Sequence, residues 1–118
     1  MATILHVDDD PAVALILEDT LRRAGHEPVA ARHVPEALHV LAATPVDLII
    51  SDYRMPGITG LEFLGMLQQE GLDVPVIMLT GHASIEHAVA SIKAGAVDYI
   101  TKPVRPQQLE LAVEQALE

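Results

Sequence analysis

The stretch ILHVDDD (residues 4–10) is a short apolar run that ends in three carboxylates, and runs of this kind recur along the chain. Three later apolar runs also end in a polar residue: 48–51 before Asp52, 76–79 before Thr80 and 97–101 before Lys102. If the four runs are parallel strands of one sheet, their carboxyl ends lie along one edge. Carboxylates, a hydroxyl and an ammonium would then converge in one crevice, and phosphoryl chemistry uses these groups.

Length and composition fit one ordinary domain. The chain has 118 residues, of which 50% are hydrophobic, so it is long enough to bury a core without disulfides or a structural metal. It has no cysteine, which excludes a disulfide framework, a thiolate zinc site and a cysteine nucleophile. We therefore expect residues 1–118 to form a single domain.

The charge balance argues against some partners. With 17 acidic and 7 basic residues the formal net charge is −10, so most of the surface should repel nucleic acid and anionic lipid. One Phe and two Tyr leave few platforms on which bases could stack. There is no apolar stretch of membrane-spanning length and no basic start typical of a signal peptide. We expect a cytoplasmic protein that binds neither nucleic acid nor membrane directly.

Strand-like runs alternate with segments of helical period, which is the pattern of βαβ units and a parallel sheet. The expected strands cover residues 3–7, 27–31, 47–51, 74–79 and 96–100. The expected helices cover residues 11–24, 35–43, 61–69, 84–93 and 106–117. Right-handed crossovers favour an α/β, doubly wound (βα)5 fold, a flavodoxin-like three-layer sandwich with five parallel strands in the order 2-1-3-4-5. The first and third strands are then neighbours, and their acidic ends meet.

The three carboxylates Asp8, Asp9 and Asp52 predict a metal site. Like charges in a partly buried cleft raise each other's pKa, and a divalent cation relieves that repulsion. Mg²⁺ prefers hard oxygen ligands and needs only one or two carboxylates. We expect Asp9 and Asp52 to be direct ligands, with Asp8 acting through a water or as an orienting group.

The same crevice suggests covalent chemistry. A carboxylate oxygen of Asp52 that faces a phosphoryl donor can accept the phosphoryl group, as in aspartyl-phosphate enzymes. The ammonium of Lys102 and the hydroxyl of Thr80 are suited to binding further phosphoryl oxygens. We therefore expect Asp52, Thr80 and Lys102 to carry the chemistry.

Four motifs, taken together and in order, resemble the response-regulator receiver domains of two-component signalling, the CheY-like superfamily. They are ILHVDDD from Ile4, DYRMPG from Asp52, LTG from Leu79 and KP from Lys102. The resemblance implies that Asp52 is the phosphoacceptor and that Asp8, Asp9 and the carbonyl of Arg54 complete the metal site. It also implies that Thr80 and Tyr99 form a switch pair and that the Lys102–Pro103 peptide is cis.

The resemblance further implies a signalling role. A histidine kinase would supply the phosphoryl group from a phosphohistidine, and phosphorylation would reshape the surface of helix 4, strand 5 and helix 5. That surface would control an output domain or a downstream partner and could form a homodimer. Residues 78–103 look most like receivers of NtrC-like enhancer-binding transcription activators, and a stand-alone receiver fits the residues equally.

Two other functions stay open at this point. A phosphatase or phosphotransferase would also use an aspartyl-phosphate, but Arg54 stands where a second acid/base aspartate would be expected, and no cap insertion encloses a substrate. An interaction module that has lost the chemistry would not need the intact set of Asp8, Asp9, Asp52, Thr80 and Lys102.

Simpler structural roles compete for some residues. Asp10 before Pro11 fits a helix N-cap better than a metal ligand. Tyr99 could be an ordinary strand aromatic. The resemblance assigns to His82 and Arg54 a part in controlling the access of water to a phosphoryl group. The six histidines include no pair with a convincing metal-ligand spacing.

Overall fold

The computed structural model describes residues 1–81 and 85–118 and shows one parallel sheet covered by helices on both faces. The strands are β1 (Thr3–Val7), β2 (Glu27–Ala31), β3 (Leu48–Asp52), β4 (Val76–Thr80) and β5 (Asp98–Thr101). The helices are α1 (Pro11–Arg23), α2 (Val34–Ala43), α3 (Gly60–Gln69), α4 (Ile85–Lys93) and α5 (Pro106–Leu117). The strand order is β2-β1-β3-β4-β5, which confirms the predicted fold class and topology.

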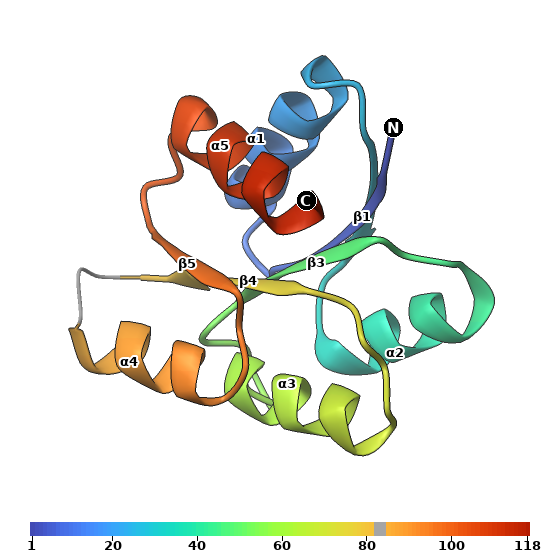
Figure 1. Ribbon diagram of the computed structural model, residues 1–118, viewed down its shortest axis with the longest axis vertical. Helices are drawn as coiled ribbons and strands as arrows, with labels where there is room; N and C mark the ends of the chain where they lie inside the picture. Colours follow the sequence, from blue (N-terminus) through green and yellow to red (C-terminus); the bar gives the residue numbers. More distant parts are fainter. Residues whose placement is uncertain (82–84) are drawn as a thin grey trace.

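The helices divide between the two faces, with α1 and α5 on one and α2, α3 and α4 on the other (Figure 1). Every residue of β3 and β4 is buried, as expected for central parallel strands that are covered on both sides. In the described part of the chain, no helix is long and apolar enough to cross a membrane.

Each face of the sheet has its own apolar core. On the α1 and α5 side the buried residues include Leu17, Leu109 and Ile50. On the other side they include Phe63 and Leu67 of α3, together with residues of β1, β3 and β4. The sheet is therefore fixed from both faces by large apolar side chains, each contributing about 1.5–3 kcal/mol when fully buried.

Strand pairing sets the positions of the strand ends. Val7 is in register with Ser51, Asp52 with Leu79, and Thr80 with Thr101. Because the strands are parallel, the residues at and just after these positions emerge at the same edge of the sheet.

Several element boundaries differ from the prediction. The third and fourth strands begin and end later than expected, and their last residues are Asp52 in β3 and Thr80 in β4. The fifth strand is 98–101 rather than 96–100, because the N–H of Ala96 donates to the Ser91 carbonyl and completes the turn that ends α4. The fourth helix was expected to begin at Ser84, which lies outside the described residues.

Candidate functional site

Three aspartates meet where β1 and β3 end. Asp8 follows β1 and is 3% exposed, Asp52 is 5% exposed, and Asp9 is exposed. One carboxylate oxygen from each lies within 4.8 Å of those from the other two. The N–H of Asp10 donates to Asp8 Oδ1 at 2.9 Å and so fixes the orientation of that carboxylate.

Lys102 places its ammonium between the two buried carboxylates. Its Nζ lies 3.1 Å from Asp8 Oδ2 and 3.2 Å from Asp52 Oδ2. Its backbone N–H donates to the Thr80 carbonyl at 2.8 Å, which ties the β5–α5 loop to the end of β4. The peptide between Lys102 and Pro103 is cis, as predicted.

Burial and neighbouring charges shift the titration of the buried pair. Burial raises the pKa of Asp52, and the charge of Asp8 raises it further, against the opposing effects of Lys102 and the Arg54 N–H. Burial alone would lower the pKa of Lys102, but the charges of Asp52 and Asp8 outweigh it and raise that pKa above its ordinary value. Lys102 thus remains a cation while the ionised form of Asp52 is disfavoured.

The donor set fits a divalent cation. Three carboxylates face a single ammonium, which leaves an excess of two negative charges when all are ionised. All the donors are hard carboxylate oxygens, which suit Mg²⁺. Asp8, Asp9 and Asp52 could therefore bind a metal ion.

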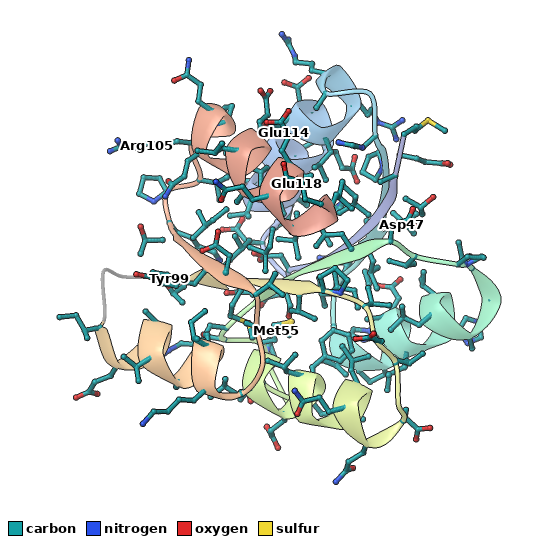
Figure 2. All side chains as sticks on the ribbon, in the orientation of Figure 1. Asp47, Met55, Tyr99, Arg105, Glu114 and Glu118 are labelled. Atoms are coloured by element: carbon teal, nitrogen blue, oxygen red, sulfur yellow. The ribbon has the colours of Figure 1, made fainter. Side chains whose placement is uncertain are left out.

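The loop after β3 is held firmly beside this site. A Cβ added to Gly60 would collide with the Asp52 carbonyl oxygen and lie 2.9 Å from Met78 Sδ, so the start of α3 packs directly on the end of β3. Met55 is 7% exposed and lies on the α3 side of the sheet (Figure 2). The side chains of Thr59 and Glu62 form a capping box that fixes the first turn of α3.

Thr80 and Tyr99 lie on neighbouring strands. Thr80 is fully buried at the end of β4, whereas Tyr99 is 40% exposed on β5. Tyr99 pairs in register with Met78, two residues before Thr80. Figure 2 shows Tyr99 beside β5 at the outer edge of the molecule.

Other polar residues have structural roles. Asp10 caps α1 by accepting a hydrogen bond from the N–H of Ala12, which confirms the predicted N-cap. His6 is fully buried in β1, with Nε2 3.4 Å from Glu18 Oε1, and burial lowers the pKa of its imidazole. The expectation for His82 lies outside the described residues.

A ring contact near the site was not predicted. The rings of Tyr53, which directly follows Asp52, and His87 of α4 are stacked with centroids 4.3 Å apart and planes at 19°. The sequence shows two rings but does not show that the fold brings them together.

The fold and the acidic strand-end site define a signalling domain of two-component systems, and comparison with known proteins agrees. The family described as response regulator receiver domain matches residues 4–114. The chain belongs to this family, whose members act as signalling domains, work with histidine kinases and output domains, and are expected to be phosphorylated with Mg²⁺.

Relatives include transcriptional regulators. The response regulator protein PilR of Pseudomonas aeruginosa is 41% identical over 113 residues, which cover 96% of this chain and 25% of PilR. The DNA-binding transcriptional regulator NtrC of Escherichia coli is 36% identical over 111 residues, or 94% of this chain and 24% of NtrC. The chain therefore spans about a quarter of the length of these relatives.

Solved structures agree in fold. The chemotaxis response regulator CheY4 of Vibrio cholerae superposes with a TM-score of 0.91 at 33% identity, covering 99% of both chains. NtrX from Brucella abortus gives a TM-score of 0.93 at 34% identity, covering 98% of this chain and 26% of NtrX.

Proposed function

We propose that residues 1–118 are a receiver domain that accepts a phosphoryl group on Asp52 from the phosphohistidine of a cognate histidine kinase. The observation that carries the proposal is the buried Asp52 carboxylate, which is grouped with those of Asp8 and Asp9 and has the Lys102 ammonium 3.2 Å away. Asp8, Asp9, Asp52 and the carbonyl of Arg54 would hold Mg²⁺, which, when bound, neutralises charge on the transferring group and aligns it.

In the transfer step, an Asp52 carboxylate oxygen forms a bond to phosphorus while the bond from phosphorus to the kinase imidazole nitrogen breaks. The electron pair stays on the imidazole, which ends as neutral histidine after taking up a proton from water. Lys102 binds one phosphoryl oxygen and the Thr80 hydroxyl donates to another. The signal ends by hydrolysis: water attacks phosphorus, the oxygen of Asp52 leaves as carboxylate, and inorganic phosphate is released with a proton.

Thr80 and Tyr99 would transmit the effect of phosphorylation from Asp52 to the α4–β5–α5 surface. Phosphorylation adds about 1.5 to 2 negative charges and strong acceptors at Asp52. Thr80 moves toward these acceptors, and Tyr99 rotates into the space released, which reshapes the α4–β5–α5 surface. Such a local change of charge acts by shifting the equilibrium between two conformations of the α4–β5–α5 surface.

The α4–β5 part of that surface is apolar and suits a second copy of this chain. A groove there is lined by Ile85, Ala88, Val89, Ile92, Lys93 and Tyr99. Exposed apolar side chains on one face fit a self-complementary, two-fold contact. We propose a homodimer through α4–β5–α5, with control of an output domain or downstream protein in cytoplasmic transcription regulation and no direct contact with nucleic acid or membrane. Sedimentation with and without phosphorylation tests the dimer.

The phosphoacceptor assignment is tested by intact-mass spectrometry after incubation with acetyl phosphate and Mg²⁺. The unchanged protein should gain the mass of one phosphoryl group, and Asp52→Asn should gain none. Asp73→Asn, which changes an exposed aspartate, is the matched control and should be labelled like the unchanged protein. Undiminished labelling of Asp52→Asn would contradict the assignment, and release of many phosphates per protein from simple phosphate esters would favour a phosphatase instead.

A further inference from the structure

Helix α4 is attached to the rest of the protein by few buried side chains. Of its residues 85–93, all of which the structure describes, only Ala88 and Ser91 are buried, and both are small. Among the described residues, neither apolar core cluster includes a residue of α4. Burial of apolar area therefore contributes little to holding this helix in place.

The Tyr53–His87 ring stack is one of the contacts that compensate. It joins the residue directly after Asp52 to the first half of α4, which lies beside α3 on the same face of the sheet (Figure 1). At the other end of the helix, Gln68 Nε2 of α3 donates to the Ala94 carbonyl at 2.9 Å. Helix α4 is thus held to the β3–α3 loop near its first end and to α3 just beyond its last residue.

Tyr53 is the fixed member of the stack. Its backbone N–H donates to the Leu79 carbonyl at 2.7 Å, and its carbonyl accepts from the N–H of Gly60 at 3.1 Å. Its side chain also packs against the core on the α2 and α3 side. The backbone of Tyr53 is therefore held by both β4 and α3, and its ring is a firm support.

His87 is the member that moves with its helix. Ser91 Oγ donates to the His87 carbonyl at 2.8 Å, a bond within α4 that any displacement of the helix carries along. A shift of α4 away from the β3–α3 loop must therefore separate the two rings.

We propose that the Tyr53–His87 stack is a latch that holds α4 in the position described here and opposes the response to phosphorylation of Asp52. The inference rests on the proposed function, in which phosphorylation changes the α4–β5–α5 surface. A ligand that favours the displaced position of α4 binds best to molecules in which the Tyr53–His87 stack is broken. Because the stack keeps the fraction of such molecules small, it lowers the apparent affinity for that ligand. Tyr53 and His87 are positioning residues, because they act through α4 and not on the phosphoryl group.

Calorimetric titration of the Mg²⁺-saturated protein with beryllofluoride, a phosphoryl mimic, tests the latch. His87→Ala should bind about two- to tenfold more tightly than the unchanged protein, because a stacked ring pair contributes a free energy of that size. His87→Phe keeps an aromatic ring and should stay within about twofold of the unchanged protein. His39→Ala removes an exposed histidine of α2 and is the matched control, with no expected change.

A double substitution separates the ring pair from either ring alone. The double variant with Tyr53→Leu and His87→Ala should bind beryllofluoride with the same affinity as each of the two single variants, because the same ring stack is lost in all three. If the effects of the two single substitutions on beryllofluoride affinity added in full in the double variant, the latch would be overturned. If thermal melting shows that His87→Ala does not fold, His87→Gln replaces it with the same expected tightening.

The outcomes distinguish the latch from the proposed function. Unchanged or weaker binding by a folded His87→Ala, or binding by His87→Phe as tight as by His87→Ala, overturns the latch and leaves the phosphoacceptor assignment intact. Absence of beryllofluoride binding by the unchanged protein, or equal binding by Asp52→Asn, overturns the proposed function and the latch with it.

Discussion

Helices α3 and α4 lie side by side on the same face of the sheet but are attached to it very differently (Figure 1). Helix α3 buries Phe63, Leu64 and Leu67 in the core, and its first residue packs against the Asp52 carbonyl. Helix α4 buries only two small residues, and its apolar residues Ile85, Val89 and Ile92 are exposed. The loop that carries the site is thus held by the well-packed helix, whereas the neighbouring helix can shift at small cost.

The difference in packing between α3 and α4 determines which of the two helices should respond to the proposed phosphorylation of Asp52. A fully buried phenylalanine resists displacement because its removal from the core costs several kcal/mol, so we expect the proposed phosphorylation of Asp52 to leave α3 in place. Elements with few buried apolar contacts open at lower free energy than the core. The structural response should therefore concentrate in α4 and β5.

The largest expected effect is on stability. Phe63→Ala in α3 should lower the free energy of unfolding by about 3–5 kcal/mol, because it leaves a cavity in the core. Val89→Ala in α4, where the side chain is 45% exposed, should change it by no more than about 0.5 kcal/mol. Urea unfolding measures both, and a similar loss for the two variants would remove the contrast between the helices.

Thr80 should link the phosphorylation site to α4 and β5 without contributing to the metal site. Thr80→Ala should weaken beryllofluoride binding about tenfold, since it removes a hydrogen bond to a charged group, and should leave Mg²⁺ affinity within about twofold. Thr101→Ala, at the position paired with Thr80 on β5, is the control. Thr80→Ser keeps the hydroxyl and should restore binding; unchanged binding by Thr80→Ala would refute its role in the switch.

The smallest expected effect is a pH-dependent gain in stability at the site itself. Burial raises the pKa of Asp52, so its contribution to stability is fully present below the unfolded pKa and is lost as pH rises through the folded pKa. At neutral pH without metal, the ionised carboxylate is therefore destabilising. Asp52→Asn should raise the melting temperature by a few degrees at pH 7, and the gain should shrink toward pH 4.

Melting curves in the presence of a chelator measure this effect. Asp73→Asn, which changes an exposed aspartate, is the matched control. A lower melting temperature for Asp52→Asn than for the unchanged protein at pH 7 would show that the pairing of Asp52 with Lys102 outweighs burial and the charge of Asp8.

The sequence was sufficient to predict the fold and the convergence of Asp8, Asp9, Asp52 and Lys102. Both depend on strand-like runs and on the rule that parallel strands end at one edge, which need no detailed contacts. The predicted start of the fifth strand was wrong, because the Ala96 N–H completes the turn after α4 instead of joining the sheet. Local propensity does not show which neighbour such an N–H will find.

The contrast between α3 and α4 could not be predicted either. Apolar periodicity shows that a helix has an apolar face, but not whether another element covers that face. The Tyr53–His87 stack likewise depends on how a strand-end loop and a distant helix are placed by the whole fold. Properties that depend on the relative placement of elements were the ones that required the structure.

Hydrogen exchange monitored by mass spectrometry, with and without Mg²⁺ and beryllofluoride, directly compares how α3 and α4 respond when the site is occupied. We expect exchange to change several-fold in peptides covering Ile85–Lys93 and to stay unchanged in Gly60–Gln69, and we expect Asp52→Asn to abolish the response. An α4 that does not respond in protein with beryllofluoride bound, or an α3 that responds as strongly as α4, would contradict this expectation.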